Sequence, residues 1–403
     1  MPMPLEGIRV LDWTIWQQGP VCSAILGDLG ADVIKIEERV AGDPGRGMLR
    51  LAGLEASDRP NFYFTANNRN KRGMTLDLKK PQAREIVYEL AKQSDVFVQN
   101  FRKGVADRLG IGYDDLRKHN PKIIYANANG YGPFGPDGSA PSYDYLGQAR
   151  SGIMMAAGEP DMPPCLVAGG IADQMGATML AFAVVTALCA RERFGIGQEV
   201  NASLLSSMMF LQGLNVSARL ILGSPMQRVS RSVTFNPLWN HYRCADDRWI
   251  ALGMLQADRY WKDFCHALGA HDLAEDPRFQ DTATRLTNVR EAIAGLAATF
   301  EKKPLAEWIA ILKEGGDFIF AGVQSVDDLP NDPQVKANDY VVDFDHPAFG
   351  TIQMVGMPFR LSQTPGTIRR AAPEFGEHTE EILMKLLGYS WDDVAALREK
   401  EVI

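Results

Sequence analysis

Residues 177–190 form the longest apolar stretch of the chain, and this stretch limits what the protein can fold into. It contains no charged residue before Arg191, a pattern that predicts a buried helix. At this length it is too short to span a bilayer. The sequence AGGIADQMG (168–176) precedes it, so one acid, Asp173, lies at the start of the expected helix.

Asp173 has a structural and a chemical interpretation. Asp is among the commonest helix N-cap residues, so a capping role is the structural alternative. However, position 176, where a capping box places Glu or Gln, is a glycine. The small residues before Asp173 also predict open space over its carboxylate. A carboxylate at a helix N-terminus is expected to stay ionised, and an ionised, accessible carboxylate is a usable nucleophile.

Charge and composition exclude several classes of function for these 403 residues. A net charge of -8 argues against nucleic acid or an anionic membrane as the main partner. The five cysteines are scattered without a CxxC pair, and the six histidines show no paired metal spacing, so we expect no metal site. The first residues lack the pattern of a signal peptide, so we expect a cytoplasmic protein.

Strands and helices alternate through the first 130 residues. Strands are predicted at 8–12, 33–37, 74–78, 95–100 and 123–126, with helices beginning at Pro20 and Pro81. This alternation predicts an α/β fold with a wound parallel sheet. The pattern changes near Asn236, where two strands and then three helices predict an α+β insertion with its own core.

Basic residues follow several of the predicted strands or the polar turn at 67–72. Ligands of open α/β sheets bind outside the carboxyl ends of the strands, and clustered cations suit a multiply phosphorylated ligand. The residues in question are Arg39, Lys71, Arg72, Arg102, Lys103 and Arg108.

The segment GYGPFG (130–135) matches the GxGxxG pattern of dinucleotide-binding folds. A true fingerprint opens a helix directly, and Pro133 and Pro136 work against a helix here. An NAD-dependent oxidoreductase is therefore a disfavoured alternative.

An ordered series of motifs resembles the class III CoA-transferase family, also called the CaiB/BaiF type, which includes formyl-CoA transferase-like proteins. The resemblance covers nearly the whole chain and is specific as a series, although no single motif is. Its segments are GIRVLDW, LGDLGADVIKIE, GDPGR, NRNKR, DVFVQNFRKGVADRLGIGYDDL, NPKIIYANANGYG, YDYLGQARSGIM, GGIADQMGATM, NPLWNHYRCADDRWIALG, DPRF and GEHTEEIL.

The resemblance implies a large Rossmann-like domain built from both chain ends, residues 1–212 and 335–403. It implies a small α+β domain at 236–325, with linkers at 213–235 and about 326–345. Two ring-like subunits of this family thread through each other, so we expect an interlocked homodimer. A heteromer with a paralogous subunit is the alternative.

The resemblance also implies the activity: CoA moves from an acyl-CoA thioester to a free carboxylic acid, with CoA as substrate and no permanently bound cofactor. The nucleophile falls on Asp173, and a residue near the thioester falls on Gln17. Gln17 and the backbone amides of 172–174 are candidate oxyanion donors. The CoA-contacting positions fall on Arg39, Lys71, Asn100, Phe101, Arg102 and Arg108.

One departure and two rivals accompany the resemblance. Some members have a glycine-rich loop over the site, where this chain has a single glycine in Gly253-Met254-Leu255-Gln256. The nearest rival is an α-methylacyl-CoA racemase, whose His–Asp dipeptide is replaced here by Tyr143-Asp144. Tyr is too weak a base at neutral pH to replace that His easily. A non-catalytic subunit of a heteromeric transferase is the other rival, and the presence of Asp173 argues against it.

Overall fold

The computed structural model of the chain describes residues 1–51 and 60–403. These residues form two compact units. The first contains residues 1–154, 166–224 and 334–403, and the second contains residues 155–165 and 225–333. Both ends of the chain therefore belong to the first unit.

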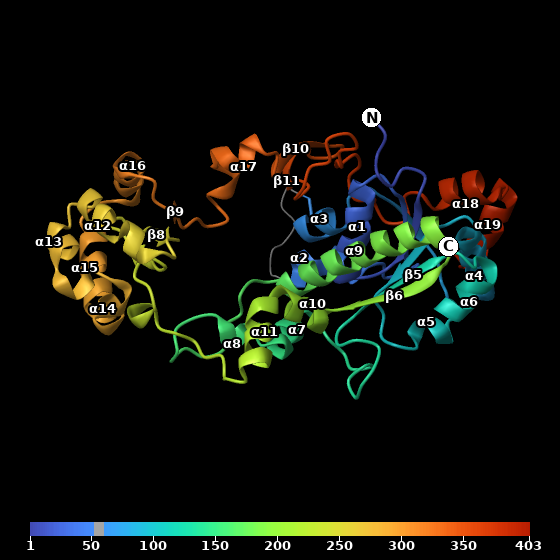
Figure 1. The fold of residues 1–403 in the computed structure, drawn as a ribbon. Helices are drawn as coiled ribbons and strands as arrows, with labels where there is room; N and C mark the ends of the chain where they lie inside the picture. The colour runs from blue at the N-terminus through green and yellow to red at the C-terminus, as the bar shows by residue number, and fades with distance from the viewer. Residues whose placement is uncertain (52–59) are drawn as a thin grey trace. The chain divides into compact units, whose positions relative to one another are not determined.

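A six-stranded parallel sheet forms the centre of the first unit, in the order β3-β2-β1-β4-β5-β6. Its strands β5 and β6 are labelled in Figure 1. The strand order is that of a doubly wound Rossmann-like sheet, in which the winding reverses between β1 and β4. The strands are β1 (Arg9–Trp13), β2 (Asp32–Glu37), β3 (Lys71–Thr75), β4 (Val96–Gln99), β5 (Ile124–Asn129) and β6 (Gln198–Ser203).

The two faces of the sheet are covered by different helices, because alternate strand residues point to opposite sides. Val10 and Val33 pack with helices α1 (Gln18–Asp28) and α9 (Ile171–Phe194) on one face. Leu11 packs on the other face with α4 (Pro81–Lys92), α18 (Thr379–Leu387) and α19 (Trp391–Glu399). The C-terminal helices thus complete the core begun by the N-terminal strands.

Shorter helices connect these elements, and a hairpin precedes the C-terminal helices. The hairpin consists of antiparallel β10 (Val341–His346) and β11 (Gly350–Val355). The other helices are α2 (Met48–Leu51), α3 (Phe62–Asn68), α5 (Val105–Arg108), α6 (Tyr113–His119), α7 (Asp144–Ser151), α8 (Ile153–Ala156), α10 (Leu204–Leu211), α11 (Gly213–Leu222) and α17 (Pro333–Ala337), with a 3-10 turn at Pro44–Gly47. The 3-10 turns at Arg231–Val233, Pro277–Phe279 and Leu329–Asn331 belong to the second unit.

Helix α9 departs from expectation in length and burial. It has 24 residues, because it includes residues 171–176 and 191–194 on either side of the apolar stretch at 177–190. By length and composition α9 could cross a membrane, as could α10 and α11 taken as one span despite their 79° bend. A core helix passes the same test, and α9 packs against α1, α10, β5 and β6. Its outer face is exposed at Phe182 and Val185, so α9 is not buried on all sides.

Two segments expected to be linkers contain regular structure. Residues 213–222 form α11. None of its side chains is buried, so no face of α11 packs into the core. The segment 326–345 contains α17 and the start of β10. The polar stretch at 67–72 is also not a turn throughout, because Lys71 and Arg72 begin β3.

The second unit has a three-stranded antiparallel sheet, β7 (His241–Arg243), β8 (Trp249–Leu252) and β9 (Phe320–Gly322). Its helices are α12 (Ala257–Ala267), α13 (His271–Glu275), α14 (Thr282–Thr287), α15 (Val289–Phe300) and α16 (Leu305–Gly315). They enclose an aromatic core that includes Trp261, Phe300 and Trp308. The guanidinium of Arg228 donates to the backbone carbonyls of Met155 (3.0 Å) and Pro163 (3.2 Å), which joins residues 155–165 to this unit.

Candidate active site

The first turn of α9 carries Asp173 as its third residue. The N-cap position is Gly170, whose φ of 75° lies in the left-handed region that favours glycine. The interpretation of Asp173 as an N-cap is therefore wrong, and its carboxylate makes no capping hydrogen bond. The side chain is half-buried.

The amides that begin α9 are satisfied by a residue of another helix. Asp144, the first residue of α7, accepts hydrogen bonds through Oδ1 from the backbone N–H of Ala172 (2.7 Å) and of Asp173 (3.2 Å). The N–H of Gln174 donates to the carbonyl of Gly170 (2.8 Å). All three amides expected to serve as oxyanion donors are therefore engaged, and that expectation is wrong.

The electrostatic surroundings of Asp173 oppose its ionisation. Burial and then the neighbouring carboxylate of Asp144 raise its pKa from 3.8 to about 7. The helix N-terminus favours the anion by a smaller amount, so the expectation of a carboxylate that stays fully ionised is wrong. Near neutral pH the carboxyl group of Asp173 is poised between its two protonation states.

Gln17 lies against the same helix start. Its Nε2 donates to the carbonyl of Gly170 (3.4 Å), and a Cβ on Gly170 would lie 2.7 Å from that nitrogen. Its neighbour Gln18 is buried against Gly176, where a Cβ would lie 2.6 Å from its Nε2. This contact explains the glycine at the position where a capping box has Glu or Gln. The structure thus brings Gln17 and the Asp173 loop together.

Two side chains fix the turn that carries Gln17. Trp16 has a φ of 65°, which is unusual for a residue other than glycine, and its N–H donates to Asp43 Oδ1 (3.0 Å). Asn100 closes the other side of the turn, because its side-chain amide both accepts from Ile15 N–H (2.9 Å) and donates to Ile15 C=O (2.6 Å). Asn100 is therefore committed to positioning this turn.

Two tyrosines lie near the site, and only Tyr143 was considered from the sequence. Burial and the carboxylates of Asp173, Asp43 and Asp144 raise the pKa of Tyr63, so its hydroxyl stays protonated. Tyr143 is exposed and packs edge-on against Trp16, with ring centroids 6.2 Å apart. Tyr63 precedes the site in a short helix without a distinctive motif, so no sequence signal marks it.

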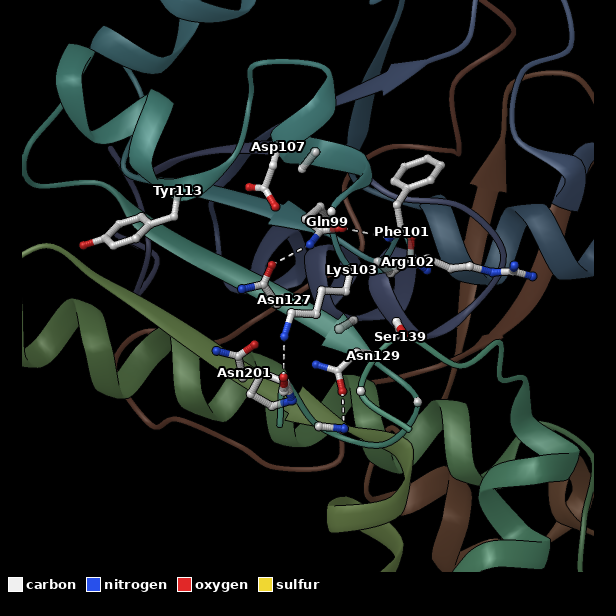
Figure 2. Close-up of a pocket in the computed structure, with 18 of the residues that line it drawn as sticks. Gln99, Phe101, Arg102, Lys103, Asp107, Tyr113, Asn127, Asn129, Ser139 and Asn201 are labelled. Atoms are coloured by element: carbon white, nitrogen blue, oxygen red, sulfur yellow. Dashed lines mark hydrogen bonds between the residues drawn. The ribbon is translucent and has the colours of Figure 1, made fainter. Parts of the chain in front are cut away.

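A polar cavity of about 360 Å³ lies at the C-terminal end of β4 and along β5 and β6 (Figure 2). A row of hydrogen bonds crosses these three strands: Gln99 Nε2 donates to Asn127 Oδ1 (2.5 Å), and Asn127 Nδ2 donates to Glu199 Oε1 (2.6 Å). Gln99 also accepts from the N–H of Phe101 (2.7 Å). The expected CoA-contacting residues Asn100, Phe101 and Arg102 line the cavity, together with Lys103.

The remaining expected phosphate contacts lie in three different environments. Arg108 is exposed on α5, and Arg39 follows β2, where it pairs with Glu401 (3.2 Å). Lys71 is fully buried, with its ammonium held by Asp12 (2.7 Å) and by the carbonyl of Pro20 (2.8 Å). An ammonium in that position cannot reach a phosphate in solvent, so the structure contradicts a phosphate contact for Lys71.

No group of three or more metal-ligating side chains is found among residues 1–51 and 60–403. The GxGxxG segment lies in a loop between β5 and α7 and does not open a helix. Its glycines therefore lack the helix N-terminus that holds a pyrophosphate in dinucleotide-binding folds.

Comparison with known proteins identifies relatives along the whole chain. The family model described as CoA-transferase family III matches residues 5–379. An acyl-CoA transferase of Fusarium pseudograminearum (strain CS3096) is 34% identical over 99% of this chain and 88% of its own. A (R)-2-hydroxy-4-methylpentanoate CoA-transferase of Clostridioides difficile is 31% identical over 100% of both chains. The crystal structure of a CaiB/BaiF family protein from Brucella suis has a TM-score of 0.86 and 28% identity, covering 96% of this chain and 100% of that one.

Proposed function

The chain belongs to CoA-transferase family III, and we propose that it moves CoA from an acyl-CoA thioester to a free carboxylic acid through covalent intermediates on Asp173. The family confirms the resemblance seen in the sequence. The observation that carries the proposed mechanism is the placement of a half-buried, accessible carboxylate at the start of α9 beside Gln17.

The chemistry follows from a carboxylate nucleophile. Asp173 attacks the thioester carbon of the donor, the C–S bond breaks, and a mixed anhydride and CoA thiolate form. The thiolate then attacks the aspartyl carbon of the anhydride, which releases the donor acid and leaves an aspartyl-CoA thioester. The acceptor carboxylate attacks this thioester, and the returning thiolate cleaves the new anhydride to release acyl-CoA and Asp173.

Each attacking group in this sequence is an anion, so no general base is required. The tetrahedral oxyanions need hydrogen-bond donors in a site that excludes water. The side-chain amide of Gln17 and the protonated hydroxyl of Tyr63 are the donors we propose. Gln17 already donates to the carbonyl of Gly170, and the charge of Asp173 acts on Tyr63.

The CoA nucleotide is proposed to lie at the ends of the strands. The cavity at the end of β4 and along β5 and β6 has room for part of a nucleotide. Arg102 and Lys103 border it, Arg108 is exposed, and Arg39 is partly exposed beside Glu401. Phe101 would contact the ligand from the cavity wall, while Asn100 would act by holding the Ile15 turn.

A second copy of the chain is proposed to cover the outer faces of α9, α10 and α11. Large apolar side chains are exposed there, including Leu214 (85% exposed) and Ile221 (80% exposed). Apolar surface of this extent on adjacent helices is typical of an interface. An interlocked homodimer would bury it, and a paralogous chain would do so in a heteromer.

The test supplies an acyl-CoA and a series of free acids, including (R)-2-hydroxy-4-methylpentanoate, in deuterated water. We expect CoA to appear on an added acid, with no hydrogen exchange alpha to the thioester, because the mechanism touches only the carbonyl carbon and sulfur. The Asp173→Asn variant is the control and should transfer no CoA. Rapid alpha exchange without transfer to any acid would instead support the racemase alternative.

A further inference from the structure

One face of α7 is shaped to hold the start of α9. Asp144, Gly147 and Gln148 occupy positions i, i+3 and i+4 of α7, which share a helix face. A Cβ on Gly147 would lie 3.0 Å from the Cβ of Ala172, so glycine allows α7 to approach closely. Gln148 is buried, and its Nε2 donates to the carbonyl of Ala168 (2.7 Å). The loop before Asp173 is thus fixed by α7.

Asp144 is the centre of these contacts. Its Oδ1 accepts from the N–H of Ala172 and of Asp173, and its Oδ2 accepts from Gln148 Nε2 (2.8 Å). Gly170, at the N-cap position, has no side chain that could accept hydrogen bonds from these amides. A neutral Ser, Thr or Asn side chain would also accept hydrogen bonds from helix amides. A second charge beside the Asp173 carboxylate therefore needs another explanation, because like charges repel.

We propose that Asp144 is a positioning residue that fixes the backbone of Asp173 and uses its charge to favour acylation of that carboxylate. This inference rests on the proposed function. When Asp173 attacks, an oxygen–carbon bond forms, the C–S bond breaks, and the negative charge leaves with the CoA thiolate. Asp173 is neutral in both the anhydride and the thioester, so the repulsion from Asp144 is present before acylation and absent afterwards.

Asp144 is the charged neighbour that affects the ionisation of Asp173. Among the described residues, Asp144 on α7 is the titratable side chain whose charge acts on Asp173, and Asp173 in turn acts on Tyr63 of α3. Tyr63 is protonated and carries no charge, and Gln17 and Gln18 are neutral amides. The elevated pKa of Asp173 follows from burial and from Asp144.

The test is Asp144→Asn, which keeps a carbonyl oxygen for the two amides and removes the charge. We expect the pKa of Asp173, measured by ¹³C NMR of labelled carboxyl groups and assigned with Asp173→Asn, to fall by about one unit or more. The acidic limb of kcat/KM for the acyl-CoA should move to lower pH by the same amount. At pH values above the acidic limb, the rate of acylation should fall by up to about tenfold for each unit by which the pKa of Asp173 falls. The KM for the acceptor acid should stay unchanged.

A matched control is Glu192→Gln, which removes an exposed carboxylate from the far end of the same helix and should change neither the pKa nor the rate. If Asp144→Asn leaves both the Asp173 pKa and the acidic limb unchanged, Asp144 is only a cap and the inference is wrong. Should Asp144→Asn not fold by circular dichroism, Asp144→Ser provides the same comparison with a hydroxyl acceptor. A wild-type protein that transfers no CoA would refute the proposed function. The NMR titration needs no turnover, so it would still show whether the charge of Asp144 raises the pKa of Asp173.

Discussion

Replacing Asp173 by Asn is expected to stabilise the protein above pH 7 while abolishing CoA transfer. The folded protein raises the pKa of this carboxyl group from 3.8 to about 7. One pKa unit corresponds to about 1.4 kcal/mol, so the roughly 3-unit difference disfavours the folded state by up to about 4 kcal/mol once Asp173 is ionised. Because the side chain is partly open to solvent, we expect Asp173→Asn to recover about 2–4 kcal/mol.

The gain in the free energy of unfolding that Asp173→Asn brings should depend on pH. Below about pH 4 the carboxyl group is protonated in the folded and unfolded chains, so the substitution changes little. Between about pH 4 and 7 the unfolded chain ionises first, and the wild type loses stability relative to Asp173→Asn. Above about pH 7 both states are ionised, and the difference reaches its plateau.

Urea denaturation of both proteins at pH 5, 6, 7 and 8 measures this difference as a free energy of unfolding. Glu192→Gln, an exposed substitution on the same helix, should show no such pH-dependent gain. Equal stability of wild type and Asp173→Asn at every pH would refute the raised pKa. A less stable Asp173→Asn would indicate that the carboxylate stabilises the helix start.

Three further outcomes are expected from the structure. Arg102→Gln combined with Arg108→Gln should raise KM for CoA thioesters but not for the free acid, because charge-assisted hydrogen bonds contribute about 1.5–3 kcal/mol each; steady-state kinetics with both substrates measures this. Lys71→Met should lower the free energy of unfolding by about 3–5 kcal/mol, because it leaves the buried carboxylate of Asp12 unpaired; urea denaturation measures the loss. Gly170→Ala should lower both stability and kcat, because alanine is strained at a φ of 75° and its Cβ would displace the side chain beside it.

Regular patterns in the sequence predict the central elements of the fold. Helix α1 and the strands β4 and β5 contain runs of apolar residues, and nearly every residue of these elements is buried. The position of Asp173 is predicted equally well, because two glycines followed by one acid and a long apolar run specify a helix start. The family resemblance adds Gln17, which the structure places against Gly170.

Long-range contacts explain what the sequence does not reveal. Lys71 occurs in a polar, basic stretch that resembles a surface turn, and only its partner Asp12, 59 positions away, shows that it is buried. The raised pKa of Asp173 comes from burial and from Asp144, which is 29 positions earlier and belongs to another helix. Helix α11 was expected to be a linker, because its apolar residues are not buried in the core of the first unit.

Covalent capture of Asp173 is the most direct test of the proposed reaction. The protein is incubated with an acyl-CoA and hydroxylamine, which cleaves an aspartyl anhydride or thioester and leaves a hydroxamate on the side chain. Peptide mass spectrometry should then find the modification on Asp173, only when acyl-CoA is present, and not in Asp173→Asn. CoA transfer that proceeds at the normal rate while Asp173 stays unmodified would contradict a covalent mechanism through this residue.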